Sequence, residues 1–342
     1  MIPTQPASRR RRVAGRTRRT IGLAAATFAL AAGLVACSGD DDFSEFNDNL
    51  DAAIPLPLDA PRVTVDTLGD VSDGGTVLSF RDVTDGADAP QEARVTVSDG
   101  FDQSVQRADS VDPAAPAGGD VVSLTLPVTA VSSAAEAPEE DERPATRRVD
   151  LRLGVAESTD LTLLEDLRSA EGFRMGWRAD DSGQISTVEL AAPTGASDEG
   201  RAYVESALTT LTSLPVVFPA ESVGVGATWS VDSRVTGDAT LLQTTTYTVT
   251  GIEGDLVDLD VEVTQRPSMG AIPIEGVPGA EDAQGQELRV ISSETTSTGA
   301  ITVDLTRPLP VDGRIVYTTR VVYGGEGEAG IVQDTTTGVE FE

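Results

Sequence analysis

The chain has 342 residues, enough to bury the core of one large domain or two small ones, and its formal net charge is −31. This charge repels nucleic acid, which needs clustered basic residues, so we expect no nucleic-acid partner. Because the chain lacks His and Lys and has one Cys, it cannot build a Ser-His-Asp relay, an imidazole metal site or a Lys Schiff base.

Residues 1–36 have the three parts of a bacterial secretory signal. Seven Arg come first, an apolar stretch runs from Ile21 to Ala36, and Leu34-Val35-Ala36-Cys37 matches the lipobox of lipoprotein signals. The apolar stretch of about 16 residues is shorter than the roughly 20 that a stable transmembrane helix needs. We therefore expect a cleaved lipoprotein signal peptide over 1–36.

Cys37 is the expected lipidation site, because it is the sole thiol of an exported chain and has no intramolecular disulfide partner. Diacylglycerol on this thiol supplies the two-chain anchoring that a single acyl chain cannot. We predict a lipoprotein tethered to the outer face of the cytoplasmic membrane. All 25 basic residues are Arg, which indicates a GC-rich genome, so we expect the cell envelope of an actinobacterium. Thr17-Arg18-Arg19-Thr20-Ile21-Gly22-Leu23 also resembles the twin-arginine signature, so both export routes stay open.

Residues 37–60 read as an acidic flexible tether, and residues 61–342 as a β-rich extracytoplasmic domain with a possible subdivision near 195. Phe43 and Phe46 could instead dock on the domain or on lipid. The residues after the leader include 18 Arg and all 56 acidic residues, which gives them a formal charge of −38. Solubility explains this acidity most simply, with loose Ca²⁺ or cationic cell-wall contacts as the alternative.

Alternating apolar and polar residues dominate beyond residue 60 and predict antiparallel strands with one buried face. The clearest run places Val257, Leu259, Val261 and Val263 on one face and acidic residues on the other. The pattern recurs around 122–126, 301–305 and 315–323. Turns are expected at Asp73-Gly74-Gly75, Asp99-Gly100, Asp181-Ser182-Gly183, Glu253-Gly254-Asp255 and Asp312-Gly313.

Two segments have the spacing of amphipathic helices. The first runs from about Asp160 to Ala170, with Ser158 or Thr159 as its cap and Gly172 as its stop. The second runs from about Asp198 to Ser213, capped by Ser197 and ended by Pro215, with Tyr203, Ala207, Leu208 and Leu211 on its apolar side. We expect a mainly β (α+β) fold, a large antiparallel sheet or half-barrel with both helices packed on it.

Two long loops are expected, an acidic one over 134–147 and a Gly- and Pro-rich one over 267–286. Short acidic clusters occur at Asp180-Asp181 and at Asp82, Asp85 and Asp88, but neither has the spacing of a calcium loop. Trp177 and Trp229 lie in alternating strands and are expected in the core. We expect no catalytic residue, no cofactor and no metal site.

The segment from Leu214-Pro215 to Val223-Gly224-Val225-Gly226-Ala227-Thr228-Trp229 resembles secreted bacterial lipoproteins of unknown function. In that family a "Leu-Pro … Val-Gly-x-Gly-x-x-Trp" signature precedes a meander of antiparallel strands. The resemblance covers roughly residues 160–342, implies the same fold class, and carries no catalytic residues. A looser, architectural analogy is to envelope lipoproteins that carry lipids in a half-barrel covered by helices.

Three functions are compatible with these features of the sequence. The first is a non-catalytic lipoprotein that binds a lipid or other hydrophobic ligand at the membrane surface. The second is a structural or interaction protein of the cell envelope, which binds a protein or cell-wall partner. The third and most remote is a carboxylate-based hydrolase, which needs two acids with separated pKa values in a cleft.

Overall fold

The computed structural model describes residues 49–83, 90–107, 110–138, 142–235, 241–268, 271–273, 287–324 and 329–342. Asp48–Glu342 form one compact unit, and Met1–Asn47 form another, none of which is described. The leader, Cys37, Phe43 and Phe46 therefore lie outside the described residues. In the ranges that are described, no helix has the length and apolar character to cross a bilayer.

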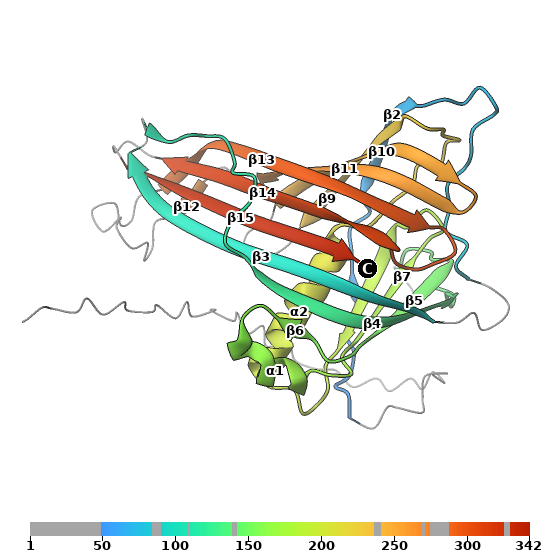
Figure 1. Ribbon diagram of the computed structural model, residues 1–342, viewed down its shortest axis with the longest axis horizontal. Coiled ribbons are helices and arrows are strands. Elements are labelled where there is room, and N and C mark those ends of the chain that lie inside the picture. The colour runs from blue at the N-terminus through green and yellow to red at the C-terminus, as the bar shows by residue number, and fades with distance from the viewer. Residues whose placement is uncertain are drawn as a thin grey trace, which may run out of the picture. The chain divides into compact units, whose positions relative to one another are not determined.

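Within the described residues, fifteen strands form one antiparallel sheet, so the predicted mainly β class is confirmed (Figure 1). The first half of the chain supplies β1 (Leu56–Pro57), β2 (Arg62–Leu68), β3 (Gln91–Arg107), β4 (Val122–Ala134), β5 (Arg147–Leu153), β6 (Glu157–Ser158), β7 (Arg174–Ala179) and β8 (Ile185–Ala191). The second half supplies β9 (Ala227–Val235), β10 (Leu241–Glu253), β11 (Leu256–Pro267), β12 (Ala271–Pro273), β13 (Glu287–Asp304), β14 (Asp312–Gly324) and β15 (Ala329–Phe341).

The strand order is β1-β8-β7-β5-β4-β3-β15-β14-β13-β11-β10-β9-β2, with β6 beside β4 and β12 beside β13. Most neighbours are also consecutive along the chain, as hairpin connections produce. Apart from the places where the short β6 and β12 intervene, three pairs are not: β1 with β8, β2 with β9, and β15 with β3, the last running from Ala329↔Arg107 to Phe341↔Val95. The last strand thus joins the two halves into one sheet.

The two ends of this strand order are held close together by the N-terminal segment. Leu56 and Pro57 of β1 pair with β8 at one end, while β2 pairs with β9 at the other. Pro57 and Arg62 are five residues apart, and five residues span at most about 18 Å. The sheet is therefore rolled, with its outer strands tied by one continuous stretch of chain.

Burial follows the predicted alternation along β11. Val257, Leu259, Val261 and Val263 are buried, while the acidic residues between them are exposed. The buried face of this and the other strands forms one hydrophobic cluster that extends from β3 and β4 across to β9 and β10. A smaller cluster around Val321 and Tyr323 lies toward the end of the sheet where β3 and β14 terminate.

The second helix, α2 (Asp198–Ser213), has the bounds that the sequence predicts. The Ser197 hydroxyl accepts the Gly200 N–H at 3.1 Å, which is an N-cap hydrogen bond. Val204, Ala207, Leu208 and Leu211 of α2 belong to the same hydrophobic cluster as the strand residues. Tyr203, however, is 40% exposed, so its predicted place on the apolar side is wrong.

The first helix is shorter than predicted. A 3-10 turn, Leu161–Leu163, leads into α1 (Leu164–Ser169). The capping side chain is Asp160, which accepts the Thr162 N–H, and not Ser158 or Thr159. The carboxylate competes better for this position because an ionised acceptor forms a stronger hydrogen bond.

Two of the predicted turns are wrong. Asp99-Gly100 lies within the 17-residue strand β3, because Gly100 permits a close crossing: a Cβ there would lie 2.2 Å from the Asp120 carbonyl oxygen. Asp312-Gly313 already belongs to β14, and the turn lies before it, at residues 305–311. Turns are present at the other three predicted places.

The acidic loop predicted over 134–147 is in part docked on the sheet. The Arg143 guanidinium donates to the carbonyl oxygens of Leu58 and Ile185, and Glu142 pairs with Arg178 at 3.4 Å. These contacts place the loop against β8 and the segment after β1. Of the loop predicted over 267–286, residues 269–270 and 274–286 lie outside the described residues.

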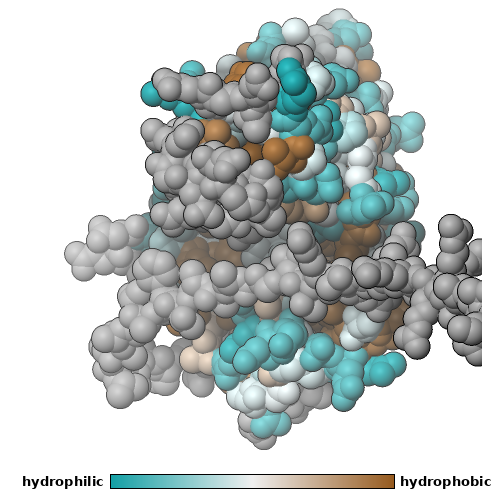
Figure 2. Space-filling view, turned by 90° about the vertical axis from the view of Figure 1, so that its left-hand side faces the viewer, coloured by the Kyte–Doolittle hydropathy of each residue, from teal (hydrophilic) through white to brown (hydrophobic). Residues whose placement is uncertain are grey.

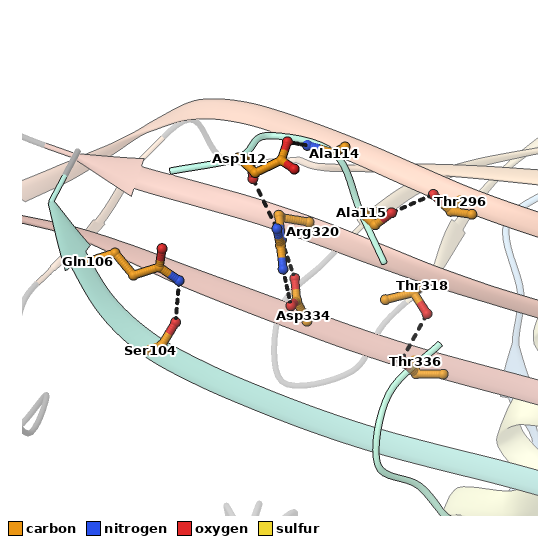
Figure 3. Close-up of polar contacts among 10 residues, drawn as sticks. All are labelled: Ser104, Gln106, Asp112, Ala114, Ala115, Thr296, Thr318, Arg320, Asp334 and Thr336. Carbon is orange, nitrogen blue, oxygen red and sulfur yellow. Dashed lines mark hydrogen bonds and ion pairs between the residues drawn. The ribbon is translucent and has the colours of Figure 1, made fainter. Parts of the chain in front are cut away.

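The segment between β3 and β4 crosses the outer face of β13, β14 and β15 (Figure 3). Arg320 of β14 pairs with Asp334 at 2.7 Å and donates to the Asp112 carbonyl oxygen, while Thr296 donates to the Ala115 carbonyl oxygen. This segment explains why Thr318, which faces away from the hydrophobic cluster, is fully buried.

Candidate functional site

The last residue of α2, Ser213, and the extended segment that follows it lie across the inner face of the sheet. The carbonyl oxygens of Ser213, Pro215 and Val217 accept hydrogen bonds from the side chains of Gln243, Tyr247 and Trp229, each at 2.8–2.9 Å. Every second carbonyl is bound in this way, because successive carbonyls of an extended chain point in opposite directions. Three donors from β9 and β10 therefore fix where α2 ends.

This arrangement gives the "Leu-Pro … Val-Gly-x-Gly-x-x-Trp" signature a structural role. Pro215 ends the helix, and Trp229 is fully buried with its indole N–H bonded to the extended segment. Gly224 lies so close to the preceding loop that a Cβ would be 1.8 Å from the Asp70 carbonyl oxygen. The predicted core position of Trp229 is confirmed, and Val225-Gly226 forms a turn just before β9.

A row of aromatic rings runs beneath the extended segment. Phe80 contacts Phe218 with ring centroids 5.4 Å apart, Phe218 contacts Trp229 at 6.2 Å, and Trp229 stacks on Tyr247 at 5.5 Å. The Phe218 N–H donates to the Ser182 carbonyl oxygen in the turn between β7 and β8. The segment after α2 thus connects the first half of the sheet to the second.

A cavity of about 60 Å³ lies where this segment faces both halves of the sheet. Its walls come from the end of α2, from β5, β7 and β8 on one side, and from β13, β14 and β15 on the other. The lining is mainly apolar and includes Trp177, Ile185, Leu211, Leu214, Ile301, Leu309, Ile315 and Phe341. No Asp or Glu is among the lining residues that the structure describes.

Among the described residues of the cavity wall, Arg147 is the one that carries a charge. Its side chain and that of Asp82 are buried, at 3% and 1% exposure, and form an ion pair at 2.5 Å. The guanidinium carbon lies 4.1 Å from the centre of the Phe80 ring, a cation–π geometry. Burial lowers the pKa of Arg147, although the Asp82 charge opposes this effect.

The buried pair is not completely hydrogen-bonded within the described residues. Ser132 and Arg147 both donate to the same Asp82 oxygen, Oδ2, so Oδ1 and the Arg147 Nε–H have no partner there. Buried polar atoms of this kind are uncommon in folded proteins.

Polar side chains also occupy the inner face beyond the cavity, between the two hydrophobic clusters. Gln265 donates to Gln243 at 2.9 Å, accepts from Thr319 at 3.0 Å and lies within 3.5 Å of the Tyr317 hydroxyl. Burial raises the pKa of Tyr317 to about 12, although its hydrogen bonds with Thr337 and Gln265 oppose the shift. These groups satisfy one another, so the network is structural.

Apolar side chains are exposed at the end of the sheet where β3 and β14 terminate. Phe101 and Val105 lie on the same face of β3 as the buried Val97, and they are 57% and 38% exposed. Ile291, at the start of β13, is 60% exposed. Figure 2 views the molecule from this side and shows brown, apolar surface in several places.

The acidic clusters considered as calcium sites serve other purposes. Asp82 is the partner of Arg147, and Asp85 and Asp88 lie outside the described residues. Asp180 accepts the N–H groups of Ser182 and Gln184 and so stabilises a hairpin turn, while Thr146 donates to Asp181. Within the described ranges, no group of His, Cys, Asp and Glu is arranged to hold a metal ion.

Arg147 was not predicted as a site residue from the sequence, although a signal is present. It begins the alternation Arg147-Val149-Leu151-Leu153, so it occupies an inward-facing position of β5. A charged residue at such a position predicts a buried ion pair. Its partner, Asp82, is 65 residues away in a loop and could not be found from local pattern.

The comparisons with known proteins add no relative. No family model matches the chain, and no curated protein matches it.

Proposed function

We propose that this chain is a non-catalytic lipoprotein, tethered through Cys37 to the outer face of the cytoplasmic membrane, whose β domain binds a small hydrophobic ligand. The observation that carries the proposal is the mainly apolar cavity between the end of α2 and both halves of the sheet. Ligand sites in proteins are usually apolar hollows with a few placed polar groups. The cavity and Arg147 have this composition.

The architecture that supports this function is a half-barrel with α2 packed in its concave face. The support comes from the shared hydrophobic cluster of α2 and the strands, and from the N-terminal segment that ties β8 to β9. In such an arrangement α2 forms one wall of the ligand site and the sheet forms the rest.

The cavity volume restricts the ligand. About 10–15 Å³ holds one water molecule, so 60 Å³ holds roughly four to six water-sized groups. Sites for drug-sized ligands occupy about 300–1,000 Å³. The expected ligand is therefore a short molecule, or the end of a longer chain whose remainder lies outside the cavity.

Native mass spectrometry with lipid extraction tests ligand binding. Residues 38–342, which include all of the compact unit, would be exported behind a leader without a lipobox from an actinobacterial host. A stoichiometric apolar adduct that survives purification is expected. A clean apo mass, with no uptake of added alcohols, ketones or lipids, would contradict the proposal.

The lipid anchor has its own test. In cells fed an alkyne analogue of palmitate, the wild-type chain is expected to be labelled and a Cys37→Ala chain is not, because that thiol is the acyl acceptor. Ser38→Ala serves as the matched control and should keep the label. Label on the Cys37→Ala chain would show that the anchor lies elsewhere.

The alternative is an interaction protein of the cell envelope, and the exposed Phe101, Val105 and Ile291 favour it. It predicts that Phe101→Ser weakens capture of an envelope partner in a cross-linking experiment, while Thr64→Ser on the far strand β2 does not. No observation favours the third candidate, a carboxylate-based hydrolase.

A further inference from the structure

The segment that leads from the proposed tether into the domain carries exposed apolar side chains. Ile54, Leu56 and Leu58 are 70%, 52% and 39% exposed, although all three are large and hydrophobic. Leu56 lies in β1, and the Leu58 N–H continues the pairing by donating to the Ser186 carbonyl oxygen at 2.9 Å. Leu56 and Leu58 therefore point to the same side of the strand, with Ile54 two residues before them. We call these three residues the N-terminal patch.

The N-terminal patch adjoins the face of the sheet that holds the cavity. Leu56 pairs with Val188 of β8, and Val188 pairs with Trp177 of β7, so the three side chains lie on one face. Val188 and Trp177 are buried, and Trp177 lines the cavity. Neighbouring strands are about 4.8 Å apart, which places Leu56 about 10 Å along the sheet from the cavity wall. The patch therefore extends the apolar inner face to the solvent.

Two prolines prevent the patch from binding another strand along the outer side of β1. The Leu58 N–H points toward β8, so the nitrogen atoms of residues 55 and 57 point away from β8. Both residues are Pro and have no N–H to donate. A protein partner thus lacks these two main-chain donors, and contact at the patch depends on its apolar side chains.

The length of chain before the domain brings the patch within reach of a membrane. Residues 38–48 separate the proposed anchor, Cys37, from Asn49, the first residue that the structure describes. Twelve peptide steps join Cys37 to Asn49 and span at most about 43 Å when fully extended. Ile54 follows only five residues after Asn49. A bilayer that holds the lipid of Cys37 is therefore the apolar partner nearest to the patch along the chain.

The charges beside the patch do not oppose contact with lipid. Asp51 forms an ion pair with Arg201, and the Arg143 guanidinium donates to the Leu58 carbonyl oxygen, next to the exposed Asp59. Acidic and basic groups are thus balanced here, unlike in the mature chain as a whole. Repulsion from anionic head groups is weak where such charges offset one another within a Debye length.

We infer that the N-terminal patch docks on the outer leaflet of the anchoring bilayer, with Ile54, Leu56 and Leu58 inserted at the boundary between head groups and acyl chains. Burial of exposed apolar area drives this contact, as it does for other proteins that lie on a membrane surface. The inference rests on the proposed anchor and binding function. It names the membrane surface as the partner and gives a hydrophobic ligand a short path from lipid to the cavity.

Photo-crosslinking to lipid tests the contact on the unaltered chain. The full lipidated chain, purified from an actinobacterial host, is reconstituted in vesicles of phosphatidylglycerol and phosphatidylethanolamine that include a phospholipid with a diazirine in its acyl chain. After irradiation, peptide mass spectrometry identifies the residues that carry lipid adducts. Adducts are expected on residues 54–58 and not on Ile291, which is 60% exposed at the end of the sheet where β3 and β14 terminate.

A variant with a matched control tests the role of the side chains. Leu56→Ser/Leu58→Ser is expected to lose the adducts on residues 54–58, because the apolar area that drives insertion is removed. Leu256→Ser removes a leucine of similar exposure, 42%, at the turn between β10 and β11 and should keep the adducts. Unchanged adducts in the double variant would contradict insertion by these leucines. Fluorescence of the buried Trp229 verifies that each variant is folded.

A second mode of attachment separates this inference from the proposed anchor. Residues 38–342, which include the compact unit, are attached through an N-terminal His tag to vesicles with a nickel-chelating lipid. Adducts on residues 54–58 in this form support the inference even if Cys37 proves to carry no lipid. Their absence from both membrane-bound forms would overturn the inference and leave the anchor and the cavity in place. Adducts on Phe101 or Ile291 instead would assign the membrane contact to another surface and overturn it as well.

Discussion

At the scale of single residues, the chain depends on a few close approaches that tolerate no added atoms. Gly224 is the tightest of them, because its backbone lies against the Asp70 carbonyl and its N–H donates to the Leu68 carbonyl oxygen. Trp229 lies a few residues later and is fully buried. A side chain added at position 224 would therefore displace the start of β9 and the aromatic rings that contact Trp229.

Gly224→Ala is expected to destabilise the domain by about 2–4 kcal/mol, because a methyl group 1.8 Å from a carbonyl oxygen forces the backbone to move. Urea unfolding followed by Trp fluorescence measures the change. Gly195→Ala is the matched control: a Cβ at this exposed glycine meets no atom within 4 Å, so the effect should stay within about 0.5 kcal/mol. Equal stability of the two variants would contradict the expectation.

The alkaline titration of this chain should report its tyrosines clearly. The chain has no Lys and one Cys, so its four Tyr dominate between about pH 9.5 and 12. Burial raises the pKa of Tyr317 to about 12, whereas an unfolded Tyr has a pKa near 10. Above pH 10 the unfolded chain releases a proton that the folded chain retains, so stability is full below pH 10 and falls toward pH 12.

The expected slope is about 1.4 kcal/mol per pH unit for each such tyrosine, and Tyr247, whose pKa burial also raises, adds a second. Urea unfolding at pH 9, 10 and 11 gives the free energy, and absorbance at 295 nm gives the ionisation. Tyr317→Phe should lower the slope by about 1.4 kcal/mol per pH unit, which is the contribution of one tyrosine. A free energy of unfolding that stays constant from pH 10 to 11 would show that Tyr317 ionises normally when folded.

At the scale of elements, the end of α2 at Ser213 and the extended segment 214–218 after it determine where α2 lies. A helix of 16 residues has only marginal stability by itself, so its position comes from tertiary contacts. The donors Gln243, Tyr247 and Trp229 reach the segment from β9 and β10, while the Ser182 carbonyl reaches it from the opposite side. The cavity lies beside this segment, so its shape depends on these hydrogen bonds.

Tyr247→Phe removes the hydrogen bond to the Pro215 carbonyl with little change in shape. It is expected to cost about 1–3 kcal/mol, because a buried carbonyl oxygen loses its donor. Tyr203→Phe, on the exposed side of α2, is the control and should be nearly neutral. Thermal unfolding of the two variants in parallel gives the comparison, and a neutral Tyr247→Phe would mean that water replaces the hydroxyl.

At the scale of the whole compact unit, the sheet depends on contacts between residues far apart in sequence. β15 closes against β3, and the stretch from β1 to β2 ties β8 to β9. Edge strands left unpaired are prone to open or to associate with other chains. The N-terminal stretch therefore acts as a tie, and the proposed membrane tether enters the domain through it.

Val63→Asp tests this tie, since Val63 packs against the main cluster while its neighbour Thr64 is exposed. The substitution should release β2, so backbone hydrogen exchange is expected to accelerate in its partner β9. Exchange should also accelerate in β8, because β1, the partner of β8, is joined to β2 by only four residues. Thr64→Asp places the same charge on the outer face and should leave both strands protected. Faster exchange in β9 with unchanged β8 would show that the two edges open independently.

Local pattern was sufficient for the elements themselves. The alternation along β11 and the Ser197 cap of α2 are properties of neighbouring residues, because side-chain period and orphan helix N–H groups act within a few residues. Predictions failed where a distant residue intervened. Asp99-Gly100 has the composition of a turn, yet the chain continues as a strand since a distant carbonyl, that of Asp120, crosses there.

Neighbouring residues were enough to predict the β-rich class and the bounds of α2, because periodicity and capping are local. The pairing of β15 with β3, the Asp82–Arg147 pair and the cavity beside it became visible only in the folded chain. These depend on long-range contacts whose partners are chosen by packing and desolvation across the entire domain. The candidate site is of this second kind, since its walls come from both halves of the chain.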